Sequence, residues 1–134
     1  MVGEEHFGTP PGKGIEIGAH TRNPVDLGVV DVAEAEREIY GSRDRLELEL
    51  GRRPRHFSYP YGRRHQITEQ NRQVVRQAGF DVCLSAYGGS VSRGTDPYDI
   101  RRMPISPWFA SPAEAGLEMA RLPRDSGSHM AAAT

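Results

Sequence analysis

The sequence contains a single cysteine, Cys83, among its 134 residues. An intrachain disulfide is therefore excluded, and the apolar run around Cys83 predicts a buried packing residue. No run of residues approaches the ~20 consecutive apolar positions of a membrane-spanning helix. The amino terminus also lacks the basic-then-apolar layout of a secretory signal. We therefore expect a soluble chain that is not exported, cytoplasmic by default, with no membrane partner.

An excess of charge of one sign is missing as well. The chain has 17 basic and 18 acidic residues and a formal net charge of -1. This balance does not attract nucleic acid, so we expect no nucleic-acid partner. The arginine pairs at 63–64 and 101–102 are typical of a solvated surface. The length suits one domain but falls below the roughly 200 residues of a complete α/β barrel.

Apolar spacing in the first half predicts a strand, a helix and a second strand. The first strand covers residues 15–20. Asp31 is the expected N-cap of a helix that begins at Val32, and Gly51 is expected to end this helix in the left-handed conformation. The second strand lies around Phe57, after a proline-containing connection.

The second half continues the same alternation. A helix is expected over residues 69–78 and an apolar strand over 80–86, which makes a right-handed parallel unit with the preceding elements. A short strand is expected over 100–105. A last helix, capped by Ser111, is expected to run to about Leu122.

Residues 1–14 read as an irregular lead-in because glycine and proline are frequent there and periodicity is weak. We expect one folded domain over residues 15–122 and a disordered tail over 123–134. The tail includes Gly-Ser-His-Met at 127–130, which resembles an expression-vector remnant and is excluded from the fold prediction.

Polar and conformationally special residues follow the first two strands where each strand ends. His20 and Thr21 follow the first, and the turn Tyr-Pro-Tyr-Gly at 59–62 follows the second. In parallel α/β folds the carboxyl ends of strands carry the chemistry. Proline fixes one backbone angle, glycine permits a sharp turn, and a backbone N–H there can face a developing oxyanion. The pattern predicts a polar pocket, with a satisfied structural histidine as the alternative.

Several stretches together resemble a known family. Their order and spacing are similar to the polysaccharide deacetylase family, the NodB-homology domain of carbohydrate esterase family four. The stretches are Ile-Glu-Ile-Gly-Ala-His-Thr-Arg-Asn at 15–23, Arg-His-Phe-Ser-Tyr-Pro-Tyr-Gly at 55–62 and Gln-Ala-Gly-Phe at 77–80. Ser-Ala-Tyr-Gly-Gly at 85–89 and Asp-Pro-Tyr at 96–98 resemble one bacterial branch, so the likeness covers roughly residues 15–105.

The resemblance implies a fold and an activity. The fold is a partial distorted (β/α) barrel with parallel strands and covering helices. The activity is metal-dependent hydrolysis of N- or O-acetyl groups, with zinc or another divalent metal as cofactor and a polysaccharide or oligosaccharide with acetylated sugars as partner. In this family an aspartate pair supplies the general base and one ligand, and an H-[ST]-x-x-H motif supplies two histidine ligands. Three ligands with one open position let the metal activate water.

The resemblance places His20 on the first histidine ligand and Thr21 on the hydroxyl of the motif, a supporting partner behind the ligands. Pro24 stands in the second histidine position and has no side-chain donor atom. No Asp-Asp pair occurs, and only fourteen residues precede the histidine strand. His56 and His65 are poor substitutes, since His56 begins its strand and His65 neighbours two arginines. We therefore expect impaired hydrolysis.

In the third motif the family often has an arginine before Pro-Tyr-Gly, where this sequence has Ser58 and Tyr59. The resemblance assigns Pro60 to the pocket wall and the backbone N–H of Tyr61 to the oxyanion contact. The late histidine that is a general acid in many members has no clear counterpart near Met103.

Three hypotheses stay open. The first is an enzyme whose missing strand comes from a longer gene product or another chain. The second is a non-catalytic remnant that binds sugar weakly through Tyr59, Tyr61, Tyr87 and Trp108, although aromatic side chains serve equally well in packing. The third is an interaction module, with a homodimer formed through an exposed sheet edge. The polysaccharide and the linkage of its acetyl group stay open too.

Overall fold

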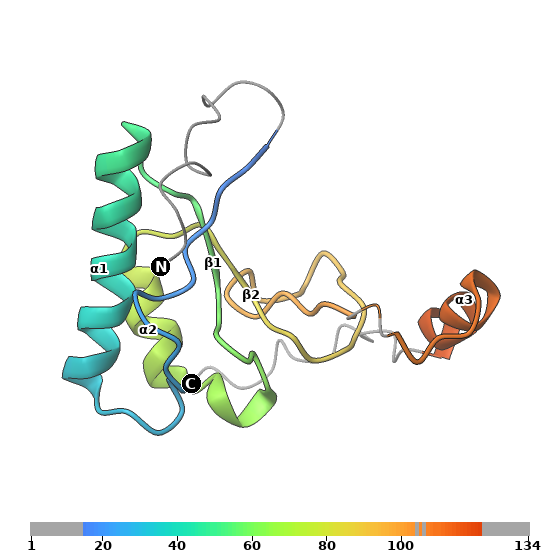
Figure 1. The fold of residues 1–134 in the computed structure, drawn as a ribbon. Helices are drawn as coiled ribbons and strands as arrows, with labels where there is room; N and C mark the ends of the chain where they lie inside the picture. Colours follow the sequence, from blue (N-terminus) through green and yellow to red (C-terminus); the bar gives the residue numbers. More distant parts are fainter. Residues whose placement is uncertain (1–14, 104, 106, 122–134) are drawn as a thin grey trace.

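The computed structural model describes residues 15–103, 105 and 107–121 (Figure 1). The predicted lead-in over 1–14 and the predicted tail over 123–134 lie outside these residues. In chain order the elements are α1 (Val32–Leu50), β1 (His56–Ser58), the short 3-10 helix η2 (Arg64–Gln66), α2 (Glu69–Gln77), β2 (Val82–Leu84) and α3 (Pro112–Arg121).

The residues predicted as helix caps are found at both ends of α1. The Asp31 carboxylate accepts a hydrogen bond from the backbone N–H of Glu34 at 2.8 Å, which satisfies a donor of the first turn. Gly51 ends the helix at φ 67°, and its N–H donates to the carbonyl of Glu47 at 2.9 Å. The predicted helix and both of its caps are confirmed.

The two strands pair in parallel, as predicted, but they are shorter than the sequence indicates. Each contains three residues, with Phe57 of β1 opposite Cys83 of β2. The second of them was expected over residues 80–86. The pairing stops soon after Ser58 because the chain turns at Pro60, which has no N–H to donate.

The other two predicted strands each contribute one isolated bridge. Ala19 lies parallel to Phe57 on one side of β1, and Ile100 lies parallel to Leu84 on the far side of β2. Two backbone hydrogen bonds, from Ala19 N to the carbonyl of His56 (2.8 Å) and from the N–H of Ser58 to the carbonyl of Ala19 (2.9 Å), join the first segment to β1. Four parallel segments therefore lie side by side in a small sheet.

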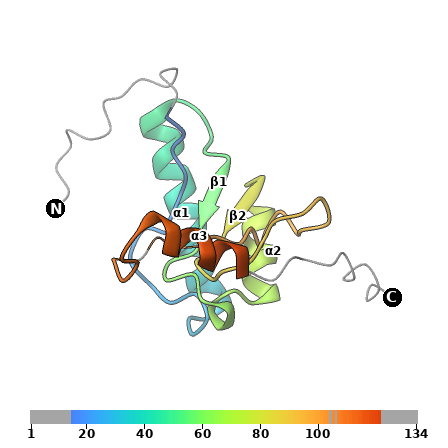
Figure 2. The ribbon, with the colours of Figure 1, turned by 90° about the vertical axis from the view of Figure 1, so that its right-hand side faces the viewer.

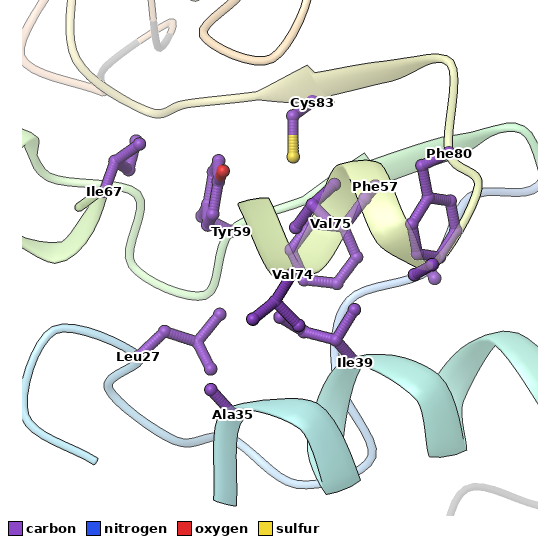
Figure 3. Packing of buried hydrophobic residues seen from close by; sticks show 12 residues of the cluster. Leu27, Ala35, Ile39, Phe57, Tyr59, Ile67, Val74, Val75, Phe80 and Cys83 are labelled. Atoms are coloured by element: carbon purple, nitrogen blue, oxygen red, sulfur yellow. The ribbon is translucent and has the colours of Figure 1, made fainter. Parts of the chain in front are cut away.

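The hydrophobic core lies between this sheet and the two helices α1 and α2 (Figures 1 and 3). Thr68 caps α2 by accepting a hydrogen bond from the N–H of Asn71 at 3.1 Å, as predicted for a cap at this position. Cys83 is 0 % exposed, so its predicted burial is confirmed. Burial raises the pKa of the Cys83 thiol to about 12. Other core side chains are Ile39 from α1, Val74 and Val75 from α2, and Phe57, Tyr59 and Phe80.

The opposite face of the sheet is open. Side chains alternate along β1 and β2, so Phe57 and Cys83 point into the core while His56, Ser58 and Leu84 are half-buried on the other face. Helix α3 lies on the open side, away from α1 and α2 (Figures 1 and 2), and none of its residues is buried. Among the described residues no helix is both long and apolar enough to cross a membrane.

Candidate ligand site at the carboxyl end of the sheet

His20 is placed at the carboxyl end of the sheet by the bridge that precedes it. Ala19 pairs with Phe57 and is buried, so the next side chain, that of His20, points away from the core and is exposed. Its Nδ1 lies 2.7 Å from the carbonyl oxygen of Ser58. Because a carbonyl oxygen only accepts, Nδ1 donates this hydrogen bond, and in the neutral ring Nε2 keeps the lone pair. Metal-binding and acid–base histidines are commonly oriented in this way.

The residue after His20 holds a strained backbone. Thr21 has φ 63°, a left-handed conformation that is uncommon for a β-branched residue. Its hydroxyl hydrogen is shared between the carbonyl oxygens of His20 (2.5 Å) and Asn23 (2.6 Å). Thr21 thus stabilises the conformation of the loop that follows His20 through two backbone carbonyls.

A buried carboxylate that the sequence analysis missed anchors this loop. Glu38 of α1 is 4 % exposed. It accepts hydrogen bonds from the backbone N–H groups of Arg22 (2.9 Å) and Asn23 (2.8 Å) and from the Asn23 side chain (2.8 Å). Burial raises the pKa of Glu38, but the bonds from Asn23 and Arg22 outweigh it, and the net pKa lies below the usual value. The signal for Glu38 was its place beside Ile39, within the apolar stripe of a predicted helix.

The turn after β1 contains a second residue with an uncommon backbone conformation. Pro60 is buried, and Tyr61 follows with φ 59° and a side chain that is 59 % exposed. Gly62 is also left-handed at φ 64°, and a Cβ there would lie 2.5 Å from the backbone nitrogen of Ala86. Within the described part of the chain the backbone N–H of Tyr61 donates no hydrogen bond. It is therefore available to an oxygen of a ligand.

Thr21 and Tyr61 are the only non-glycine residues with positive φ among those that the structure describes. Each comes just after the bridge or strand that ends at this edge. A left-handed conformation costs about 1 to 3 kcal/mol for such residues, and strained residues cluster at ligand sites. The backbone thus marks the same edge of the sheet that the sequence pattern predicted.

A shallow, open depression of about 370 Å³ runs along the open face beside these residues. His20 and Ser58 lie at one end of it, and Glu16 and His56 lie farther along, with His56 Nδ1 at 3.6 Å from the Glu16 carboxylate. The full lining is Glu16, Gly18, Ala19, His20, His56, Phe57, Ser58 and Leu84. Gly18 packs closely against His56, since a Cβ there would lie 3.0 Å from the His56 carbonyl oxygen.

The described residues do not fit a zinc site. A zinc centre needs three or four nitrogen, sulfur or oxygen ligands within bonding distance. His20 is one candidate ligand, but the next motif position is Pro24, and no group of three or more His, Cys, Asp or Glu side chains in the described part of the chain is arranged to hold a metal. His65 lies exposed on η2 rather than in the lining of the depression. No chemical step through a metal can therefore be derived from this donor set.

The predicted sugar-binding aromatic residues lie in three different environments. Tyr59 is 1 % exposed and packs edge-on against Phe57 in the core, so in this structure it contributes packing rather than a ligand surface. Tyr87 donates a hydrogen bond to the Asp99 carboxylate, and the guanidinium of Arg64 lies 4.9 Å from its ring centre. Trp108 is 87 % exposed in the segment before α3.

Fold and site together define a parallel α/β domain with a histidine and a strained turn at the carboxyl end of its sheet. The family model described as polysaccharide deacetylase matches residues 11–83, more than half of the chain. The chain belongs to the polysaccharide deacetylase family. No curated protein sequence matches the chain.

Two solved structures show the likeness of fold. One is the Streptococcus pyogenes deacetylase PplD in complex with acetate, with TM-score 0.66 and 22 % identity over 76 % of this chain. The other is a polysaccharide deacetylase from Bacillus cereus, with TM-score 0.56 and 18 % identity over 65 % of this chain. The match spans 43 % and 27 % of these two proteins, less than half of either.

Proposed function

We propose that this polysaccharide deacetylase-like domain binds acetylated carbohydrate at the carboxyl end of its sheet, and that the chain by itself is impaired in hydrolysis. One observation carries the proposal. The site has an oriented histidine and an available backbone N–H, yet Pro24 stands where the second ligand is expected, and among the described residues no three-ligand group completes a metal centre. The described part of the chain thus offers groups that can bind the sugar, but no ligand set that could hold a water-activating metal.

The proposed binding mode uses the groups that are already placed. The N–H of Tyr61 donates to the carbonyl oxygen of an acetyl group, and buried Pro60 forms the rigid wall behind it. His20 Nε2 accepts from an amide N–H or hydroxyl of the sugar, because Nδ1 is used by Ser58. In this arrangement binding does not require a metal. Tyr87 and Trp108 are proposed as outer sugar contacts.

We propose further that residues 15–122 form one domain and part of a distorted (β/α) barrel. The order of four parallel segments, with α1 and α2 covering one face of the sheet, supports this. In a barrel the open face with His20, His56 and Ser58 would face the interior.

A second candidate, an interaction module, is favoured by one specific observation. The segment at Gly18 and Ala19 pairs with β1 on one side only among the described residues, which leaves a sheet edge that a second copy of the chain can extend. A homodimer formed in this way would depend on concentration and not on metal. Analytical ultracentrifugation over a hundredfold range of concentration separates this candidate from a monomeric binding domain.

Acetate release from an N-acetylglucosamine oligomer, measured with added zinc, tests whether the chain hydrolyses acetyl groups. We expect no release above background from the chain or from Pro24→His, since restoring one ligand leaves the base and the aspartate ligand missing. When binding of the same oligomer is monitored through amide chemical shifts, the largest changes should centre on Tyr61. The affinity should be lower in His20→Ala. Turnover by the unmodified chain or by Pro24→His would contradict impairment, and an absence of shifts would contradict binding.

A further inference from the structure

The fourth extended segment, around Ile100, brings an arginine to the carboxyl end of the sheet. The N–H of Ile100 donates to the carbonyl of Cys83 (2.9 Å), and the carbonyl of Ile100 accepts from the N–H of Ser85 (2.9 Å). Two residues later, the N–H of Arg102 donates to the carbonyl of Tyr87 at 3.3 Å. The segment thus runs beside β2 and continues past its end, where Arg102 is exposed.

The guanidinium of Arg102 spans the ends of both strands. Its Nε donates to the carbonyl of Ser85 at 2.6 Å, and its Nη2 donates to the hydroxyl oxygen of Ser58 at 2.9 Å. Ser58 lines the depression, and its backbone carbonyl is also the acceptor for His20. Arg102 and His20 are therefore held at the rim of the depression through the same residue.

The positive charge of Arg102 is not neutralised by the residues that hold it. Both of its acceptors are neutral oxygens, and among the described residues it forms no ion pair. Other arginines do pair, as Arg55 does with Asp81 (2.6 Å) and Arg76 with Asp96 (3.1 Å). Arginine has five N–H donors, and the two contacts use two of them. An oriented, planar, cationic group thus keeps free donors at the site.

We propose that Arg102 forms a carboxylate-binding subsite, so that the carbohydrate ligand of this domain carries acidic sugars. A guanidinium binds a carboxylate through two parallel charge-assisted hydrogen bonds, a match that a neutral acetamido group cannot make. The inference rests on the proposed carbohydrate-binding function and adds the substrate class to it. The same chemistry is shared by a uronic-acid residue of a polymer and by a free short carboxylate, so the test includes both.

The test uses the full chain and three ligands: a trimer with glucuronate between two N-acetylglucosamine units, an N-acetylglucosamine trimer and acetate, each titrated while amide and arginine side-chain signals are followed. We expect the acidic trimer to bind about tenfold more tightly than the neutral one, because hydrogen bonds to charged groups are about twice as strong as neutral ones. Arg102→Gln should remove this tenfold preference and leave affinity for the neutral trimer within twofold. Arg102→Lys should keep part of it, since the charge remains and the fork is lost.

Arg93→Gln is the matched control, because Arg93 is exposed and makes no ion pair among the described residues. Its affinity for the acidic trimer should equal that of the unmodified chain. Equal affinity for the two trimers, or equal losses in Arg93→Gln and Arg102→Gln, would overturn the subsite. Acetate binding at Arg102 without any preference for the acidic trimer would overturn the assignment to an acidic polymer.

Failure of the inference and failure of the proposed function give different results. If the neutral trimer binds and the acidic trimer gains nothing, the subsite is wrong and carbohydrate binding stands. If the acidic trimer binds through Arg102 and the neutral trimer does not bind, the acetyl contact is wrong and the subsite stands. Circular dichroism of each variant checks that the fold is kept.

Discussion

Glu38 gives the sharpest prediction about the histidine loop. Its buried carboxylate accepts three hydrogen bonds from Arg22 and Asn23, which follow the strained residue Thr21. Glu38→Ala removes all three acceptor contacts and leaves the donors of the loop without their acceptor in the protein. We expect both global destabilisation and loosening of the loop that carries His20.

The magnitude follows from the number and kind of bonds. A hydrogen bond to a charged group contributes about 1.5–3 kcal/mol. The simple sum overestimates the loss, because Arg22 and Asn23 are exposed and their donors can bind water instead. We therefore expect Glu38→Ala to lower the free energy of unfolding by about 2–4 kcal/mol, and Glu38→Gln, which keeps one acceptor oxygen, by about 1–2 kcal/mol.

The pH dependence gives an independent check. The native pKa of Glu38 lies below its ordinary value of 4.5. The stability that this charge contributes is therefore fully present above pH 4.5 and is lost as the pH falls through the lower native pKa. The difference in unfolding free energy between the unmodified chain and Glu38→Gln should stay constant from pH 7 to about 5 and shrink below 4.5.

Urea unfolding followed by circular dichroism, at several pH values between 7 and 3.5, measures this difference. Glu36→Gln is the control, since Glu36 lies on the same helix and its side chain makes no hydrogen bond or ion pair among the described residues. A loss under 0.5 kcal/mol in Glu38→Ala, or a Glu38→Gln difference that does not change with pH, would refute the anchoring role.

Two further predictions concern the turn and the core. Gly62→Ala should lower the free energy of unfolding by more than about 2 kcal/mol, because a Cβ at this positive φ would lie 2.5 Å from the nitrogen of Ala86. Gly51→Ala, with open space around it, should lower it by about 1 kcal/mol. Equal urea midpoints for the two variants would contradict this difference. Tyr59→Phe should leave stability unchanged or raise it by up to about 1 kcal/mol, because the buried hydroxyl has no hydrogen-bond partner among the described residues. A loss above about 1 kcal/mol in thermal unfolding would contradict this reasoning.

The helices could be predicted because their signals are local. Asp31, Gly51 and Thr68 act at helix ends, and each makes the cap bond or backbone angle that its type predicts. The strands were overestimated for the opposite reason. An apolar run such as 80–86 indicates burial, but the length of the pairing depends on the neighbouring segment, and the turn at Pro60 ends β1 after Ser58.

In the candidate site, too, local features could be predicted and long-range contacts could not. The motif located His20 and the Tyr61 turn, since both lie at strand ends that the sequence marks. It could not locate Glu38 or Arg102, because these residues lie 18 and 82 positions after His20 in the sequence. They come close to His20 only through the packing of α1 and of the last extended segment. Tyr59 was assigned to the ligand surface, yet strand alternation turns its side chain into the core.

Zinc titration of the purified chain by calorimetry at neutral pH, with His20→Ala in parallel, tests the central claim most directly. The claim is that this chain has the deacetylase fold without a complete metal centre of its own. It predicts that neither protein binds zinc stoichiometrically and that their titrations coincide. One tightly bound zinc per chain that is lost in His20→Ala would contradict the claim and would favour metal-dependent hydrolysis as the function.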